Sequence, residues 1–269
     1  MVRPRYWVDT SEVLDRIKRE EGNAKAIPKW LMGWRDITNA TNERTVIVSV
    51  LPIAAVNHKL PLLNFPEKSS TVLLCCFYGN LNAIVLDYVA RQKIGGTDLT
   101  YHYLKQFPVL LPNAYSQNDI EFIVPRVLEL TYTAIDLIPF AEDLWDSGDQ
   151  KMRRLFMKQR HGEKAATFEE FSAFDSAHLP EGVKLQDVLP PFLFDSEQRS
   201  SLRAALDARY ARLYGLSRDD LRYILDPADP MGEDYPSETF RVLKEKEIAE
   251  YGEYRTQQLI LEAWDGEGV

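Results

Sequence analysis

Arginine, asparagine and threonine side chains are concentrated in residues 34–45, close to the start of the chain. Arg35, Asn42 and Arg44 belong to the residue types that form hydrogen bonds with base edges and phosphates. An apolar, β-branched run at residues 46–51 follows at once and predicts a strand that would hold these side chains rigidly. The stretch therefore favours contact with nucleic acid. Surface charges around a turn are the alternative explanation of the same residues.

A second group of candidate side chains surrounds a double glycine at residues 95–96. Arg91 and Lys93 precede the glycines, and Thr97 follows them. Glycine lets a backbone approach a ligand closely, and these cations and this hydroxyl group could bind phosphate. The stretch lacks the Lys-Ser/Thr pair of a P-loop and the spacing of a dinucleotide fingerprint. An ordinary turn is therefore the alternative.

Residues for bond-making chemistry are not found in the sequence. No Cys or His pair has the spacing of zinc ligands, and no nucleophile elbow or convincing Ser/His/Asp set occurs. The two cysteines, Cys75 and Cys76, lie in an apolar run at residues 71–78. This run predicts a buried strand, in which the cysteines would be small core residues. We therefore expect no catalytic residue and no metal site.

The chain of 269 residues carries a net charge of -9, which is unevenly distributed. Residues 1–112 contain 14 Lys and Arg against 10 Asp and Glu, whereas residues 113–269 contain 18 against 31. If nucleic acid binds, the first part is therefore expected to bind it. No apolar run approaches the roughly 20 residues that span a bilayer, and no secretory signal is recognised. We expect no membrane contact and a cytoplasmic location.

The elements that must position these residues differ between the two parts. In residues 1–112 we predict a helix at 12–20, strands at 46–51 and 71–78, and a helix at 82–91 capped by Asn80. Beyond residue 112 the apolar spacing is helical, and predicts helices at 119–138, 197–214, 221–225, 238–250 and 253–264. The predicted fold is α+β, with a strand-rich part followed by a mainly helical region.

Three blocks of the sequence carry a resemblance to a known family. They lie at residues 34–52, at residues 78–109 and at residues 223–264, and include Asn42, Glu43 and Arg44, then Gly79, Asn80 and Arg91, then Tyr251, Gly252 and Trp264. The chain resembles the C-terminal portion of bacterial DNA adenine-N6 methyltransferases, among them fused type II (type IIG-like) restriction-modification enzymes and related phage-defence methylases. The second block is also similar to the closing half of target-recognition domains in type I specificity subunits.

This resemblance implies a target-recognition domain at 1–112 that binds double-stranded DNA. It also implies a helical region at 113–269 that packs on this domain and on a methyltransferase core present in cis or in trans. The core's motifs for S-adenosylmethionine and for the target adenine do not occur here, so the cofactor is expected for the parent enzyme and not for this chain. The resemblance raises the expectation that Arg35, Arg44, Arg91 and Lys93 contact DNA. Less patterned polar positions nearby are better candidates for base reading: Asn57, His58, Lys59, Tyr101 and His102.

A different class of function is the main alternative. The acidic helical part could be a protein-interaction subunit that docks a separate methyltransferase or nuclease through its aromatic side chains: Tyr210, Tyr214, Tyr223, Phe240, Tyr251, Tyr254 and Trp264. Packing between helices would explain these aromatic residues equally well. An enzyme without a recognisable motif is the third hypothesis.

Overall fold

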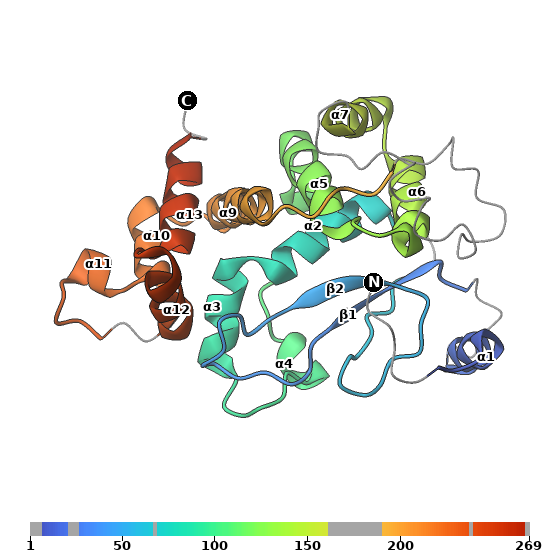
Figure 1. Cartoon of the computed structure of the whole chain (residues 1–269), viewed down its shortest axis with the longest axis horizontal. Coiled ribbons are helices and arrows are strands. Elements are labelled where there is room, and N and C mark those ends of the chain that lie inside the picture. Colours follow the sequence, from blue (N-terminus) through green and yellow to red (C-terminus); the bar gives the residue numbers. More distant parts are fainter. Residues whose placement is uncertain (1–6, 21–26, 67–68, 161–189, 237–238, 267–269) are drawn as a thin grey trace.

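A computed structural model describes residues 7–20, 27–66, 69–160, 190–236 and 239–266. Helices dominate, and the described strands form one two-stranded antiparallel sheet, so the predicted α+β class with a mainly helical region is confirmed. Figure 1 shows the sheet in the lower part of the view, with the helices of the second half above it and to its left.

The sheet pairs β1 (Trp30–Trp34) with β2 (Val48–Pro52). The β2 strand confirms the prediction from residues 46–51, whereas β1 lies in a stretch for which no strand was predicted. Gly33 lets the loop that follows β2 pass close to β1, because a Cβ atom here would lie 2.7 Å from the Pro61 carbonyl oxygen. Trp34 is fully buried, and its indole Nε1–H donates to the Leu99 carbonyl oxygen at 2.7 Å.

The apolar run at residues 71–78 is helical, so the predicted strand is wrong. It forms α2 (Thr71–Asn82), which meets α3 (Ile84–Lys93) at a 56° bend. A helix that is apolar on every side belongs in a core, and α2 packs against α5, α6 and β2. A short apolar run cannot be assigned to strand or helix by periodicity alone. Cys75 and Cys76 are buried, as predicted, and burial raises the pKa of Cys76 to about 12.

Asn80 does not cap α3, contrary to prediction. It lies inside α2, where its amide group donates to the Tyr214 hydroxyl at 2.8 Å and its carbonyl oxygen accepts from the Leu110 amide at 2.8 Å. The first amide of α3, that of Ile84, instead donates to Asp207 Oδ1 at 2.7 Å. A carboxylate from a distant helix therefore takes the place of a local cap.

Most of the predicted helices are present with small shifts of their ends. The N-terminal half also contains α1 (Thr10–Glu20) and α4 (Tyr101–Leu104). The predicted helix at 119–138 is divided into α5 (Gln117–Thr131), a 3-10 turn (Ile135–Leu137) and α6 (Ile138–Ser147). The remaining helices are α7 (Gln150–Arg160), α9 (Ser196–Leu213), α10 (Arg218–Leu225), α11 (Ala228–Met231), α12 (Arg241–Tyr251) and α13 (Arg255–Gly266).

The C-terminal helices begin and end at residues of the types that favour helix caps. Asp195 accepts from the Gln198 amide at 2.9 Å at the start of α9, and Ser217 and Asp220 form a capping box at the start of α10. Gly215 and Gly252 adopt φ values of 74° and 82°, the left-handed conformation that favours glycine after a helix.

The core is continuous across the predicted boundary at residue 112. One cluster of buried side chains joins Met32 and Trp34 of β1 and Cys76 of α2 to Val124 of α5 and Tyr210 of α9. A second cluster joins Ile84 of α3 to α9, α10, α12 and α13. In the described part of the chain, no single helix is long and apolar enough to cross a membrane; the bent pair of α2 and α3 meets that test only when the two are taken together.

Candidate nucleic-acid interface

The structure divides the ten predicted site residues into two groups. Arg35, Asn42, Arg44 and Arg91 are buried or half-buried, around the turn at residues 39–45. The other six lie on the surface, on loops or at helix ends: His58, Lys59, Lys93, Thr97, Tyr101 and His102. The two groups have different partners and are described separately.

Arg91 is an interior side chain, with 7% of its surface exposed. Its five N–H groups are matched by five acceptors: Asp87 Oδ1 and the backbone carbonyl oxygens of Ala40, Asn42, Glu43 and Thr239, at 2.7–3.0 Å. Its guanidinium also stacks on the Phe240 ring, 4.3 Å from the centroid. An arginine has no further N–H group to offer. The predicted phosphate contact of Arg91 is therefore corrected: this side chain binds the protein's own backbone.

Arg44 is also occupied by groups of the protein itself. Its Nε lies 3.3 Å from Asp87 Oδ2, its Nη1 lies 4.0 Å from Asp207 Oδ2, and Nη2 donates to the Asn82 carbonyl oxygen. Asp87 is fully buried and also accepts from the Thr45 amide. Burial raises the pKa of Asp207 to about 6, although the nearby Arg44 guanidinium acts in the opposite direction. We call Arg44, Asp87, Arg91 and Asp207 the interior charge cluster.

Arg35 and Asn42 shape the same turn. The Arg35 Nη2 donates to the Arg44 carbonyl oxygen at 2.8 Å, and the Asn42 amide donates to the Thr38 hydroxyl at 3.2 Å. Thr38 in turn donates to the Thr45 carbonyl oxygen at 2.7 Å. Together with the interior charge cluster, these bonds fix the turn against α3 and α9. The first sequence block therefore serves as framework, with only part of Arg35 and Arg44 exposed.

The exposed candidates lie on adjacent loops, which we call the loop face: residues 53–62, residues 93–100 and α4. Two isolated bridges place these loops beside β1 and its extension, Gly33 with Leu62 and Ile37 with Asp98. The Tyr101 hydroxyl donates to the Leu62 carbonyl oxygen at 2.9 Å, and its ring meets Trp34 edge-on at 4.6 Å between centroids. Segments that are distant in the sequence therefore form one surface.

Lys59 holds the loop face together electrostatically. Its Nζ lies 2.8 Å from Asp98 Oδ1 and 3.0 Å from Asp36 Oδ2. The hydrogen bonds with Asp98 and Asp36 raise the pKa of Lys59, and Lys59 in turn lowers the pKa of Asp98. The Thr97 hydroxyl donates to the other Asp98 oxygen at 3.1 Å. Lys59 and Thr97 are thus engaged, whereas the His58 and Lys93 side chains make no hydrogen bond with any described residue.

A third cationic region was missed in the sequence. A groove of about 490 Å³ runs between β2, the end of α2, α9, α12 and α13, and its arginines are Arg44, Arg199, Arg203 and Arg255. We call it the arginine groove. Three of these arginines lie in the acidic half, where the charge total predicted no anion site. The signal that could have been used is the spacing of Arg199 and Arg203, which places two cations on the same face of one helix.

The aromatic residues of the helical half are mostly packed. Tyr210, Phe240 and Tyr254 are buried, whereas Tyr251 exposes 48% of its surface. Among the described residues, no group of three or more His, Cys, Asp or Glu side chains could hold a metal ion. The chain has no match among protein families, curated proteins or solved structures.

Proposed function

We propose that this chain is the DNA-recognition portion of a restriction-modification or phage-defence adenine-N6 methyltransferase. The observation that carries the proposal is the loop face, where loops from separate parts of the sequence present His58, Lys93, Tyr101 and His102 on one surface. Loops held by a rigid scaffold are common sites of recognition. The resemblance of the three sequence blocks to such methyltransferases supports the same assignment.

Within this proposal, the loop-face residues have separate tasks. Lys93 supplies a free cation for a phosphate, a contact that positions DNA without reading its sequence. His58, Tyr101 and His102 read base edges or stack, and a good bidentate base contact contributes roughly 1–3 kcal/mol of discrimination. Lys59, held between two aspartates, orders the loops. Methyl transfer itself, with S-adenosylmethionine, would belong to a methyltransferase core in cis or in trans.

A salt titration of binding to double-stranded DNA tests the proposal. Because phosphate contacts release counterions, affinity should fall steeply as salt rises, and Lys93→Gln should weaken binding and reduce the slope by about one. Arg16→Gln is the matched control, because Arg16 is an exposed cation on α1, which is not one of the segments that form the loop face. The measurement is fluorescence anisotropy of a labelled duplex between 50 and 300 mM salt, about the range in which such contacts respond.

Two results would count against the DNA proposal. One is the absence of binding at low salt to a pool of random duplexes, since sequence-independent affinity needs only phosphate contacts. The other is equal weakening by Lys93→Gln and Arg16→Gln, which would show a general charge effect and no localised interface.

A further inference from the structure

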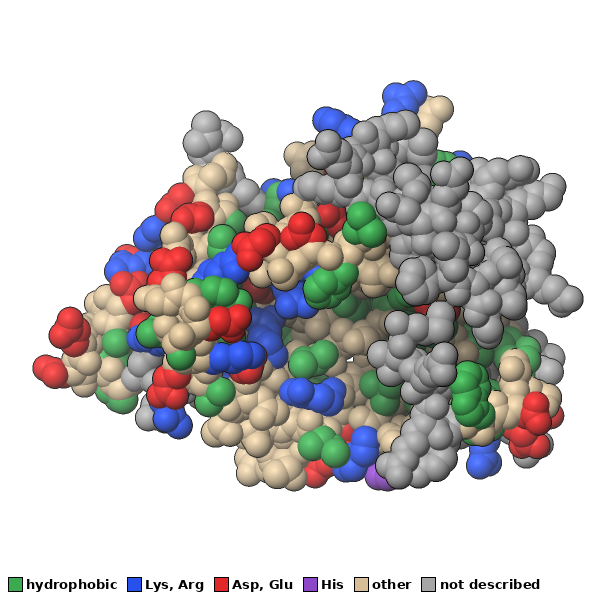
Figure 2. All heavy atoms as spheres, viewed as in Figure 1, with side chains coloured by type: hydrophobic (Ala, Val, Ile, Leu, Met, Phe, Trp, Pro, Cys, Tyr) green, Lys and Arg blue, Asp and Glu red, His purple; other side chains and the backbone are tan. Residues whose placement is uncertain are grey.

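The arginine groove separates the strand-bearing part from the C-terminal helices. Residues of β2 and of the end of α2 form one wall, and residues of α9, α12 and α13 form the other. Figure 2 shows Lys and Arg side chains gathered in the middle of this face, where the surface is hollowed beside the C-terminal helices. A volume of about 490 Å³ lies within the usual range for small-molecule sites, roughly 300–1,000 Å³.

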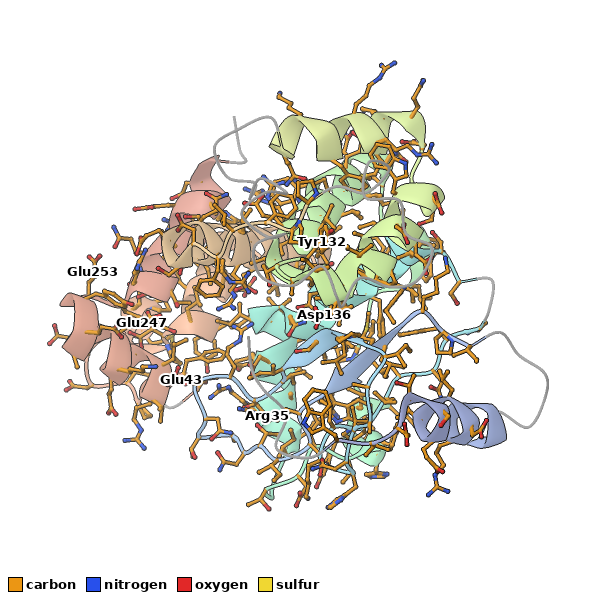
Figure 3. All side chains as sticks on the ribbon, turned by 45° about the vertical axis from the view of Figure 1, so that its right-hand side comes forward. Arg35, Glu43, Tyr132, Asp136, Glu247 and Glu253 are labelled. Carbon is orange, nitrogen blue, oxygen red and sulfur yellow. The ribbon has the colours of Figure 1, made fainter. Side chains whose placement is uncertain are left out.

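The carboxylates of the groove are already engaged. Glu43 pairs with Lys246 at 2.9 Å, and Asp207 accepts from the Ile84 amide at 2.7 Å. Glu247 accepts from the Thr256 amide and hydroxyl at 2.7 and 2.5 Å, at the start of α13. Figure 3 shows Glu43 and Glu247 near one another, at the edge where the turn at residues 39–45 faces α12. These acids therefore serve structural contacts.

Two of the four arginines are neutralised as well. Arg44 faces Asp87 and Asp207, and Arg255 donates through both Nη atoms to Glu197. Their charges are balanced within the protein. They contribute to the walls of the groove but do not create its excess of positive charge.

Arg199 and Arg203 form no ion pair with a described carboxylate. The buried Asp207 interacts electrostatically with Arg203 and also faces Arg44. Arg199 donates to the Leu130 carbonyl oxygen at 2.9 Å and stacks at 4.8 Å on the Phe194 ring, both uncharged partners. Arg203 makes no hydrogen bond or ion pair with a described residue. Burial and then repulsion from Arg203 lower the pKa of Arg199. Like charges one turn apart destabilise a helix, so this arrangement would be relieved by a bound anion.

We propose that the arginine groove binds a phosphate ester, held by the guanidinium groups of Arg199 and Arg203. A guanidinium group can donate two parallel hydrogen bonds to a phosphate. Two such groups on successive turns of α9 offer more N–H donors than one carboxylate could accept, so a phosphate suits this pair better. The groove also has room for the remainder of a nucleotide. The phosphate could belong to a free nucleotide or to the backbone of a nucleic-acid strand. This site shares no residue with the loop face, so it does not depend on the proposed function.

The test uses the full chain with pyrophosphate, ATP and an eight-nucleotide oligothymidine without terminal phosphates. At least one of the three should bind in calorimetry, and Arg199→Gln with Arg203→Gln should weaken that binding tenfold or more. The matched control is Arg154→Gln with Lys158→Gln, which removes two exposed cations at the same spacing from α7, outside the groove. This control should change affinity less than twofold.

The ligands distinguish the two sources of phosphate. Binding of ATP without the oligothymidine would identify a free nucleotide, with pyrophosphate showing how much of that affinity the phosphates alone provide. Binding of the oligothymidine without ATP would identify a strand backbone. In the unaltered chain, phenylglyoxal labelling of Arg199 and Arg203 should be suppressed by the ligand that binds. No binding of any probe at millimolar concentration, or equal affinity of the double variant and the control, would overturn the proposal. Duplex binding that depends on Lys93 would persist in that case.

Discussion

Arg91 is a surface cation by its position in the sequence and an interior side chain in the structure. It follows the apolar positions of a helix and precedes a double glycine, a setting in which a cation commonly faces solvent. Its acceptors are mainly backbone carbonyl oxygens, from Ala40, Asn42, Glu43 and Thr239. Every residue has a backbone carbonyl group, so these acceptors cannot be recognised from the residue types in the sequence. Residue type alone therefore could not separate this arginine from Lys93, which is exposed.

Replacing Arg91 should destabilise the whole fold. Arg91→Lys keeps the charge but loses the planar fork and most of its donors, and Arg91→Gln also leaves buried Asp87 with less compensation. Removing one partner of a buried ion pair typically costs about 3–5 kcal/mol, so we expect a loss of this order in the free energy of unfolding for Arg91→Gln. Urea denaturation followed by circular dichroism would measure it.

The neighbouring cation provides the control for this prediction. Lys93→Gln changes an exposed side chain on the same helix and should alter stability by no more than roughly 0.5 kcal/mol. If Arg91→Gln and Arg91→Lys were as stable as Lys93→Gln, the five hydrogen bonds would not be stabilising the turn, and the interior assignment of Arg91 would be wrong.

Among the elements, the helices of the second half were the most predictable. Their caps, such as Asp195 and Ser217, act within three residues of the helix start, so both partners appear together in the sequence. The α2 helix was harder to predict from the sequence, because the neighbours that cover its apolar faces are distant in the sequence. The break between α2 and α3 likewise depends on Asp207, more than a hundred residues away.

Gly79 offers a test of how closely α2 and α9 pack. A Cβ atom at this position would lie 2.7 Å from the Tyr210 hydroxyl oxygen, and this hydroxyl donates to the Cys76 carbonyl oxygen at 2.6 Å. Alanine is favoured over glycine inside a helix by about 1 kcal/mol. Overpacking nevertheless costs about 1–3 kcal/mol, so we expect Gly79→Ala to lower the melting temperature in calorimetry.

Gly96→Ala is the matched control, because the added methyl group would meet no neighbouring atom. No atom lies within 4 Å of a Cβ built at Gly96, and its φ is not positive. The melting temperature of this variant should stay close to that of the unaltered chain. A more stable Gly79→Ala variant would mean that α9 can move away from α2 at little cost, contrary to the close contact at Tyr210.

At the scale of the molecule, the chain divides into two parts by charge but not by packing. The charge total changes sign near residue 112, whereas the main core joins side chains from both sides of that position. The totals also conceal local surfaces, because Arg199 and Arg203, which form no ion pair with a described carboxylate, lie in the acidic part. The fold class and several helices were therefore predictable from the sequence. The sequence could not separate the exposed loop-face candidates from the four buried or half-buried ones, since burial and pairing depend on tertiary contacts.

The shared core leads to a prediction for fragments. Residues 1–112 alone would expose the face of α2 that packs on α5 and α6, and would lose the Tyr210 and Asp207 contacts of α9. We expect this fragment to show no cooperative unfolding transition in thermal circular dichroism, whereas the full chain shows one. A fragment that unfolds cooperatively near the melting temperature of the full chain would establish 1–112 as an independent domain.

The turn at residues 39–45 and the loop after β2 differ in whether they can accept an inserted residue. Arg91 donates to three backbone carbonyl oxygens of the turn, so an inserted residue there would displace these acceptors. Ala54, Ala55, Asn57 and His58 lie exposed at the tip of the other loop, where lengthening would disturb few contacts. Evolution or design of a new binding preference therefore has room in the loop after β2, while the turn must keep its length.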